Sequence, residues 1–196
     1  MNRDELTKEM RWYIADQLDK ERLERVNENS RPVRPCESFY TRYGKRWIDI
    51  VLASIALIVT LPVNLVIGIC TYFDVGRPVF FHQERLGKDG KIIHITKFRN
   101  MKNLTDAHNE LLNPNLRVTK FGRFVRKTSL DELLNFYSIL KGDMSIIGPR
   151  PLVPEYAGRY SRRHAMRMAV RPGLECPPRK KLDHAWTWQE QFENDI

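Results

Sequence analysis

An uncharged segment constrains the fold of this chain more than any other feature. From Ile50 to Ile69, twenty residues, no side chain is charged. A helix of that length is about long enough to cross the hydrocarbon core of a bilayer. A core helix of a soluble domain is the alternative, but such a helix usually has a polar face, and this segment is apolar all round. We therefore expect residues 41–75 to form a membrane-inserted helix.

The flanks of this segment bear on its topology. The flanking basic residues are Arg42, Lys45 and Arg46 before it, and Arg77, Arg85, Lys88 and Lys91 after it. Lys and Arg are enriched on cytoplasmic flanks, and here both flanks have them. Pro62 near the middle favours a kink, and Asp49 and Asn64 should lie at shallow depth or have a buried partner. The pattern predicts a re-entrant helix that returns to the face it entered; a tilted single crossing is the alternative.

Three regions follow from this assignment. Residues 1–40 read as an amphipathic helix, over about 3–28, followed by a proline-containing linker. Residues 76–196 should form a domain at the cytoplasmic face. The expected fold class is α+β: a mainly helical small domain with a β-hairpin, a kinked re-entrant membrane helix and interfacial amphipathic helices.

The domain of residues 76–196 has two recognisable patterns. Residues 78–101 read as two strands around the turn Lys88–Gly90. Residues 129–140 read as one helix, with Gly142 as its stop. Polar residues 102–116 read as a loop with a short helix.

Charge and cysteine content limit the partners and the compartment. Lys and Arg number 33 against 24 Asp and Glu, which gives a net charge of +9. Nucleic acid, anionic lipid and phosphorylated metabolites are all suitable partners. The apolar segment and the lack of a nucleic-acid motif argue against the first. Cys36, Cys70 and Cys176 form no CxxC pair, which fits a reducing compartment.

The stretch RKTSLDELLNFYSILKGD, residues 126–143, places adjacent carboxylates after a basic segment. Ser129 and Glu132 have capping-box spacing, so one interpretation is helix capping. The other is chemistry, because a basic segment before a helix start can hold phosphate. There Asp131 could attack phosphorus or, like Glu132, bind Mg²⁺. The residues alone leave both interpretations open.

Several motifs resemble the bacterial sugar transferase family, the monotopic phosphoglycosyl transferases. They are YGKRWIDIVLASIALIVTLP, GRPVFFHQERLGKDGKIIHITKFRNM, GRFVRKTSLDELLNFYSILKGDMSIIGPRPLVPEY and VRPG, in family order over residues 43–173. The resemblance implies transfer of a sugar-1-phosphate from a UDP-sugar to polyprenyl (undecaprenyl) phosphate, with release of UMP. The expected place is the cytoplasmic face of the bacterial inner membrane, in the first membrane step of glycoconjugate synthesis.

The resemblance also implies residue roles. Asp131 maps onto the nucleophile that forms a covalent phosphosugar intermediate, and Glu132 onto its assistant in proton or metal handling. Mg²⁺ is the expected cofactor, with Asp131 and Asp143 as candidate ligands; for Asp143 the alternative is satisfying backbone donors. Candidate substrate contacts are Gln83, Arg85, Lys97, Arg99, Arg126, Arg150 and Arg171. Cross-strand pairing is the alternative for Lys97 and Arg99, and a structural turn for Arg150.

The sequence also departs from the family. Leu134 and Asn135 follow Leu133 where Pro and Gln are usual, and LECPPRKKLDHAW follows RPG in place of a Gly-Trp-Ala-Gln type segment. With the early stop at QFENDI, these departures indicate a shortened or divergent form. An inactive membrane scaffold of the same fold is therefore the competing hypothesis. The sequence leaves the sugar open and allows a homo-oligomer.

Overall fold

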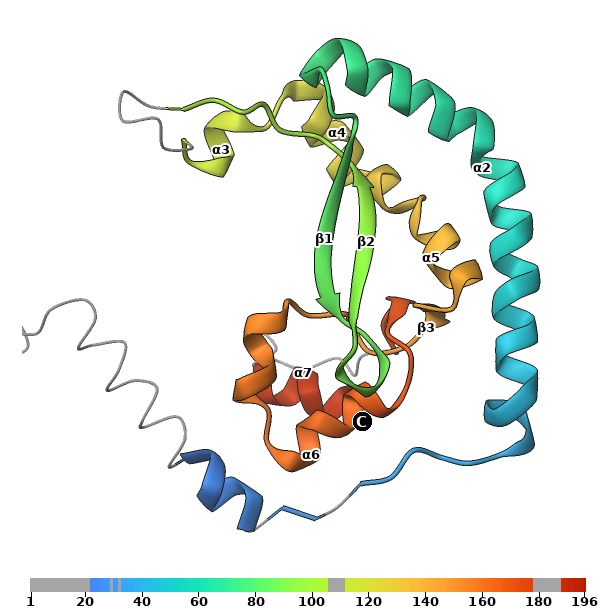
Figure 1. Cartoon of the computed structure of the whole chain (residues 1–196), viewed down its shortest axis with the longest axis vertical. Helices are drawn as coiled ribbons and strands as arrows, with labels where there is room; N and C mark the ends of the chain where they lie inside the picture. Colours follow the sequence, from blue (N-terminus) through green and yellow to red (C-terminus); the bar gives the residue numbers. More distant parts are fainter. Residues whose placement is uncertain (1–21, 29, 32, 106–111, 178–187) are drawn as a thin grey trace, which may run out of the picture.

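The computed structural model describes residues 22–28, 30–31, 33–105, 112–177 and 188–196. Its longest element is helix α2 (Lys45–Val75), which directly follows the π-helix η2 (Tyr40–Gly44). Helix α2 runs along one side of the molecule and changes direction in its second half (Figure 1). Most of the predicted N-terminal amphipathic helix lies outside the described residues; residues 22–28 of it are helical.

The surface of α2 is mostly unprotected by the rest of the chain. Pro62 lies inside the helix and removes one backbone hydrogen bond, which accounts for a kink. Asp49, Ala53, Ile67 and Thr71 are buried. Large apolar side chains elsewhere on the helix are exposed, including Val51, Leu52, Ile55, Ile58, Val59, Leu61, Leu65, Val66 and Ile69. Such an apolar surface needs a cover, and the helix is long and apolar enough to cross a membrane.

Polar contacts attach the start of α2 to the domain. Asp49 is buried and accepts hydrogen bonds from the Ser145 hydroxyl at 2.8 Å and the Ile146 N–H at 3.1 Å. Lys45 also donates to the Ser145 hydroxyl. Arg46 donates to the carbonyls of Ile139 and Leu140, at 2.6 and 2.8 Å. Of the two alternatives expected for Asp49, shallow depth or a buried partner, the structure shows the buried partner.

The end of α2 is attached to the same domain. The Thr119 hydroxyl donates to Asp74 at 2.5 Å and also accepts from the Gly122 N–H, which caps helix α4 (Lys120–Lys127). Arg99 donates to the carbonyl of Val75, the last residue of α2, at 2.8 Å. Both ends of the apolar helix are therefore held by one polar domain.

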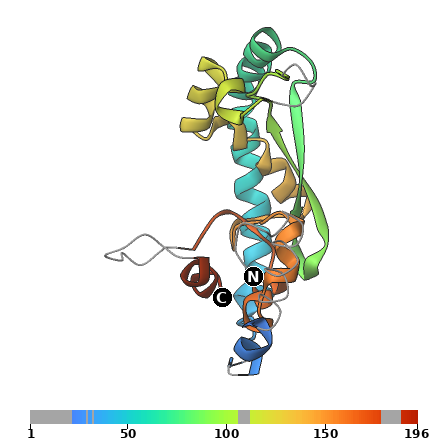
Figure 2. The same cartoon turned by 90° about the vertical axis from the view of Figure 1, so that its left-hand side faces the viewer.

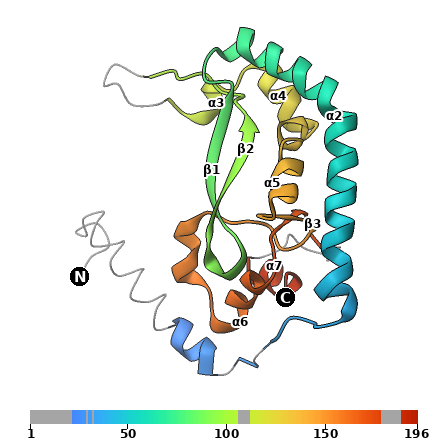
Figure 3. The same cartoon turned by 45° about the vertical axis from the view of Figure 1, so that its right-hand side comes forward.

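The predicted hairpin is confirmed. Strands β1 (Phe80–Leu86) and β2 (Ile92–Phe98) pair antiparallel around the 3-10 turn η3 (Lys88–Gly90). Side chains alternate along a strand, so Ile93, Ile95 and Lys97 share one face. In Figures 1 and 3, helix α5 (Asn135–Lys141) lies between this hairpin and α2.

The single helix predicted over residues 129–140 is wrong. Ser129 has φ 55°, in the left-handed region, and makes no side-chain cap; a 3-10 turn η4 (Leu130–Glu132) follows, and α5 begins only at Asn135. Left-handed Ser129 separates α4 from η4, because a helix needs right-handed φ and ψ throughout. From η4 to the start of α5 the backbone N–H groups bond to carbonyls three residues earlier, as Glu132 does to Ser129 and Phe136 to Leu133, so the path is a tighter 3-10 turn. The stop at Gly142 is confirmed: its φ is 100° and its N–H caps the carbonyls of Ser138 and Ile139.

The rest of the domain is built from short elements. They are α3 (Pro114–Arg117), β3 (Ser145–Ile147), η5 (Pro154–Arg159), α6 (Arg162–Ala165), η6 (Met166–Ala169), β4 (Gly173–Glu175) and α7 (Trp188–Asn194). Strands β3 and β4 pair in parallel, which the sequence did not predict. A Cβ on Gly173 would lie 2.1 Å from the Gly148 nitrogen, so this close approach requires glycine.

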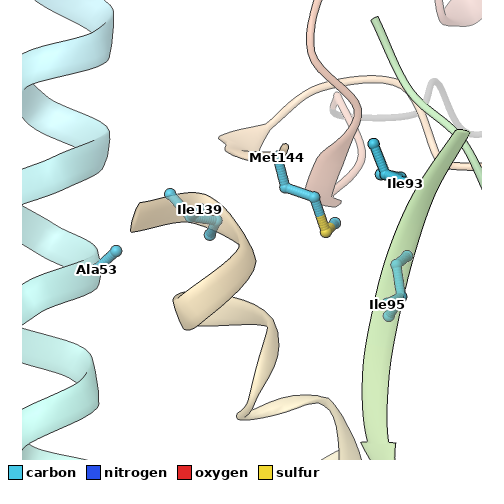
Figure 4. Close-up of a cluster of buried hydrophobic side chains, with 5 residues drawn as sticks. All are labelled: Ala53, Ile93, Ile95, Ile139 and Met144. Atoms are coloured by element: carbon cyan, nitrogen blue, oxygen red, sulfur yellow. The ribbon is translucent and has the colours of Figure 1, made fainter. Parts of the chain in front are cut away.

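Apolar clusters hold the described elements together, among them a third one of Ile67, Phe98 and Val125 besides the two that follow. In the first, Ala53 of α2 faces Ile139 of α5, and Met144 lies beside Ile93 and Ile95 of β2 (Figure 4). The second joins Leu86, Leu152, Tyr160 and Phe192 and attaches α7 to the domain. Seen edge-on, the described elements form a narrow layer with α2 along it (Figure 2).

Candidate active site

A small cleft brings together several of the residues predicted from the sequence. It lies between β2, the η4 turn, the start of α5 and the β3–β4 connections, and encloses about 50 Å³. Its lining residues are Arg85, Ile95, Lys97, Glu132, Asn135, Met144, Arg150, Pro151, Gly173 and Leu174. A space of this size accommodates a phosphate-sized group, and three of the lining side chains are cationic.

Two of the cleft's cations, Arg85 and Arg150, line it together and interact through their charges. The pKa of Arg85 is lowered by its burial and then by the positive charge of Arg150, while Glu132 and Glu155 oppose the change. Arg85 donates to Gln83 Oε1 at 2.7 Å, so Gln83 orients the guanidinium. Like charges near one another repel, and an anion between them offsets that cost. The cationic lining of this cleft is therefore suited to an anion.

Lys97 contributes the third cation. Its Nζ lies 2.7 Å from Glu132 Oε1, and both side chains are half-buried. This contact differs from the structural alternative considered for each residue. Glu132 does not cap a helix, and Lys97 pairs with η4 and not across the hairpin. This ion pair fixes the edge of the cleft nearest Asp131.

Asp131 lies beside the cleft, on η4. It is 7% exposed, and the Asn100 amide donates to its Oδ2 at 3.4 Å. Burial raises the pKa of Asp131; Lys97 lowers it in part, Glu132 raises it further and Arg126 lowers it. The carboxylate thus has cationic neighbours but is held in a partly desolvated place, a condition found at functional sites.

Asn135 is a cleft residue that the sequence analysis missed. It is 3% exposed, and its Oδ1 is buried without a hydrogen-bond partner in the described part of the chain. Buried polar atoms are nearly always paired, so an orphan acceptor that lines a cleft is suited to a ligand's donor. Its position three residues after Glu132 puts it on the same side of a helical path, which was the available signal.

Other predicted residues lie outside the cleft. Arg99 donates to the carbonyls of Val75, Arg77, Pro78 and Met101, and so supports the end of α2. Arg171 donates to the Gly142 carbonyl at 2.8 Å, beyond the far end of α5. Arg126 is exposed on α4 and acts on Asp131 through its charge.

The structure does not bring Asp131 and Asp143 together. Asp143 follows α5 at its C-terminal end and pairs with Lys141 at 2.9 Å, whereas Asp131 precedes the same helix. No group of three or more His, Cys, Asp and Glu residues that could hold a metal ion occurs among the residues described. The neighbouring carboxylates Asp131 and Glu132 still suit Mg²⁺, which takes one or two carboxylates and completes its shell with substrate phosphates and water.

Comparison with known proteins shows the family of the chain. Residues 40–196 match the family model described as "Bacterial sugar transferase". The chain is 38% identical over 152 residues to the uncharacterized sugar transferase EpsL of Bacillus subtilis, covering 78% of the chain and 75% of EpsL.

Two longer relatives have more specific names. The UDP-glucose:undecaprenyl-phosphate glucose-1-phosphate transferase of Escherichia coli is 39% identical over 162 residues, covering 78% of the chain and 34% of that protein. The UDP-N-acetylgalactosamine-undecaprenyl-phosphate N-acetylgalactosaminephosphotransferase of Aeromonas hydrophila is 36% identical over 135 residues, covering 66% of the chain and 32% of that protein. The chain thus spans about a third of the length of these two relatives.

Proposed function

Because the chain belongs to the bacterial sugar transferase family, we propose that it transfers a sugar-1-phosphate from a UDP-sugar to a polyprenyl phosphate such as undecaprenyl phosphate. The observation that best supports this is the cationic lining of the cleft: Arg85, Arg150 and Lys97 line it with Glu132, and Asp131 lies beside it. Phosphoryl transfer depends mainly on positioning and on neutralising charge at the non-bridging oxygens. The cleft offers cations for those oxygens, and the Asp131 carboxylate at its edge is the group that attacks.

We propose a reaction in two displacements at one phosphorus atom. An Asp131 oxygen attacks the sugar-bearing phosphorus, the bond from that phosphorus to the bridging oxygen breaks, and UMP leaves with the bridging oxygen. A phosphate oxygen of the lipid acceptor then attacks the same phosphorus, and the Asp131 carboxylate is released. Arg85, Arg150 and Lys97 bind the non-bridging oxygens in both steps.

Within this proposal, Glu132 assists Asp131 by helping to hold the metal ion, and its position supports this role. Its carboxylate is next to the nucleophile in sequence and is oriented by Lys97. Asp131 and Glu132 would hold Mg²⁺ together with the substrate's phosphates, and the bound ion supplies further positive charge to the diphosphate. Asp143 has no part in this arrangement, since it lies at the other end of α5.

We further propose that α2 is re-entrant and that the domain lies at the cytoplasmic face of the inner membrane. A spanning helix would place its two ends on opposite sides of the bilayer, some 30 Å apart across the hydrocarbon core. Here Asp49 near the start and Asp74 near the end both bind the same polar domain. A phosphate carried by a lipid at that face would lie at the same membrane surface as the domain.

The test is UMP release by the purified chain in detergent with polyprenyl phosphate and a panel of UDP-sugars. Sustained release with one sugar, lost in Asp131→Asn, is the expected result. A scaffold of the same fold would release UMP from no donor, and the substitution would change nothing.

A further inference from the structure

A second and larger cavity lies away from the candidate active site. It encloses about 580 Å³, within the roughly 300–1,000 Å³ typical of small-molecule sites. Its lining residues are Arg22, Arg25, Val26, Ser30, Arg31, Ser161, Arg163, His164 and Glu193. It shares no lining residue with the cleft beside Asp131.

Hydrogen bonds join the two walls of this cavity. The Arg162 N–H donates to Asn27 Oδ1 at 2.7 Å, and Arg163 Nη1 donates to the Arg31 carbonyl at 3.1 Å. These contacts attach residues 22–31 to α6, although about 130 residues separate them in sequence. The cavity is therefore a product of tertiary structure and not of one basic helix.

Among the described residues of the lining, cationic groups outnumber carboxylates. The guanidinium groups of Arg22, Arg31 and Arg163 and the His164 imidazole accompany one carboxylate, Glu193. That carboxylate is already engaged, by Arg163 Nη2 at 2.8 Å and by His164 Nε2 at 3.0 Å. Hydrogen bonding from Arg163 lowers the pKa of Glu193, as expected where positive charge is in excess.

We infer that this cavity binds a phosphate-bearing anion, a phosphate monoester or a diphosphate. Guanidinium groups match phosphate oxygens with two parallel hydrogen bonds. The Ser161 hydroxyl accepts from the His164 N–H and keeps its own hydrogen as a further donor. The phosphate belongs either to a soluble metabolite or to a lipid headgroup, since the domain works at a membrane.

Calorimetric titration of the full chain in detergent with pyrophosphate tests the site. The candidate active site also holds cations, so the titration uses an Arg150→Gln background, in which that site is weakened. In this background, Arg22→Gln with Arg31→Gln should raise the dissociation constant at least tenfold, because two exposed guanidinium groups are lost without loss of core packing. Arg162→Gln is the matched control: it removes an exposed charge next to Arg163 but outside the lining, and should change the constant less than twofold.

A second substitution should change the affinity for pyrophosphate in the opposite direction. Glu193→Gln removes the only carboxylate of the described lining and leaves Arg163 and His164 to the ligand, so pyrophosphate should bind several-fold more tightly. Equal effects of Arg162→Gln and the double substitution would overturn the inference, because pyrophosphate would then be attracted by the general positive charge of the surface and not by the cavity. Unchanged or weaker binding in Glu193→Gln would also overturn it.

Nanodiscs distinguish the two sources of phosphate. If anionic headgroups occupy the cavity, the affinity for pyrophosphate should be lower in discs that contain phosphatidylglycerol than in pure phosphatidylcholine discs, and the Arg22/Arg31 double substitution should remove the difference. Equal affinity in both discs, with loss in the double substitution, assigns the cavity to a soluble phosphate. Absence of binding in both discs and in detergent refutes the site.

Discussion

A carboxylate that attacks phosphorus works in its ionised form, yet the fold places Asp131 where ionisation is unfavourable. Burial is the largest cause of its raised pKa, and Lys97 offsets that only in part. The charged form of Asp131 therefore lowers the free energy of unfolding relative to a neutral side chain at the same place. Active sites commonly retain such destabilising groups because function requires them.

This strain gives a prediction with a definite pH dependence. Asp131→Asn should abolish UMP release, by at least about 1,000-fold, and raise the melting temperature at pH 7. A raised folded-state pKa means that the carboxyl stabilises the fold below its unfolded pKa, near 4, and that this benefit is lost as pH rises through the folded pKa. The gain in melting temperature should therefore shrink as pH falls toward 4.

Glu132→Gln is the control for that experiment. It breaks the 2.7 Å ion pair with Lys97 and should lower stability at pH 7 by up to about 1 kcal/mol. Thermal unfolding in detergent at several pH values measures both variants. A lower melting temperature for Asp131→Asn at pH 7 would contradict the burial argument.

Asn135 leads to the second prediction at this scale. Its unpaired Oδ1 is buried at the cleft, so Asn135→Leu should leave stability unchanged or higher while it weakens substrate binding. We expect about a tenfold loss in kcat/KM, the cost of one hydrogen bond to a ligand. Steady-state UMP release and thermal unfolding measure the two effects. Normal kinetics in the variant would mean that Asn135 does not contact substrate.

Among the elements, helix α2 decides how the chain meets the membrane. If both of its ends bind one domain on one side, cysteines placed before and after it should be accessible from the same side. Tyr43→Cys and Lys88→Cys, both at exposed positions, serve this purpose after Cys36, Cys70 and Cys176 are replaced by serine. A maleimide that cannot cross the bilayer should label neither site in intact cells and both after lysis. Labelling of only one site in intact cells would mean a true crossing.

The packing of α2 on α5 gives a matched pair of substitutions. Ile139 is fully buried against Ala53, so Ile139→Ala should cost about 2–5 kcal/mol of unfolding free energy. Ile58 is 74% exposed on α2, so Ile58→Ala should cost far less in the same detergent. Denaturant unfolding compares the two; equal losses would contradict this packing of α2.

Elements with a strong local pattern were predictable, and elements that depend on distant partners were not. The apolar segment around Pro62 and the alternation in β1 and β2 are local signals. Strands β3 and β4 are three residues each, and their pairing includes a close approach of Gly148 and Gly173 that no local pattern reveals. The capping-box spacing of Ser129 and Glu132 misled because Lys97 engages Glu132 and Ser129 is left-handed.

At the scale of the molecule, the composition of the site depends on which cationic side chains the fold brings together. Arg85, Lys97 and Arg150 were predicted as substrate contacts, and all three line the cleft. Arg99, Arg171 and Asp143 had equally suitable side chains, but the fold uses them on backbone carbonyls or with Lys141. Asn100 and Asn135 were not predicted, because an amide becomes significant only through what buries it.

The C-terminal residues show how remote parts of the chain support the cleft. Arg167 and Asp195 form a buried ion pair at 2.5 Å, and Arg167 also donates to the Arg150 carbonyl at 2.9 Å. Helix α7 thereby supports the backbone at one wall of the cleft. Helix α7 and Asp195, which follow the segment LECPPRKKLDHAW that departs from the family pattern, therefore have a structural role next to the site.

Whether Asp131 accepts the phosphosugar can be read from peptide mass spectrometry after incubation with a UDP-sugar that supports UMP release, without lipid acceptor. We expect an added mass of one sugar phosphate on the peptide that contains Asp131, released when polyprenyl phosphate is supplied and absent from Asp131→Asn. An adduct on another residue, or turnover by Asp131→Asn at the wild-type rate, would show that Asp131 is not the nucleophile.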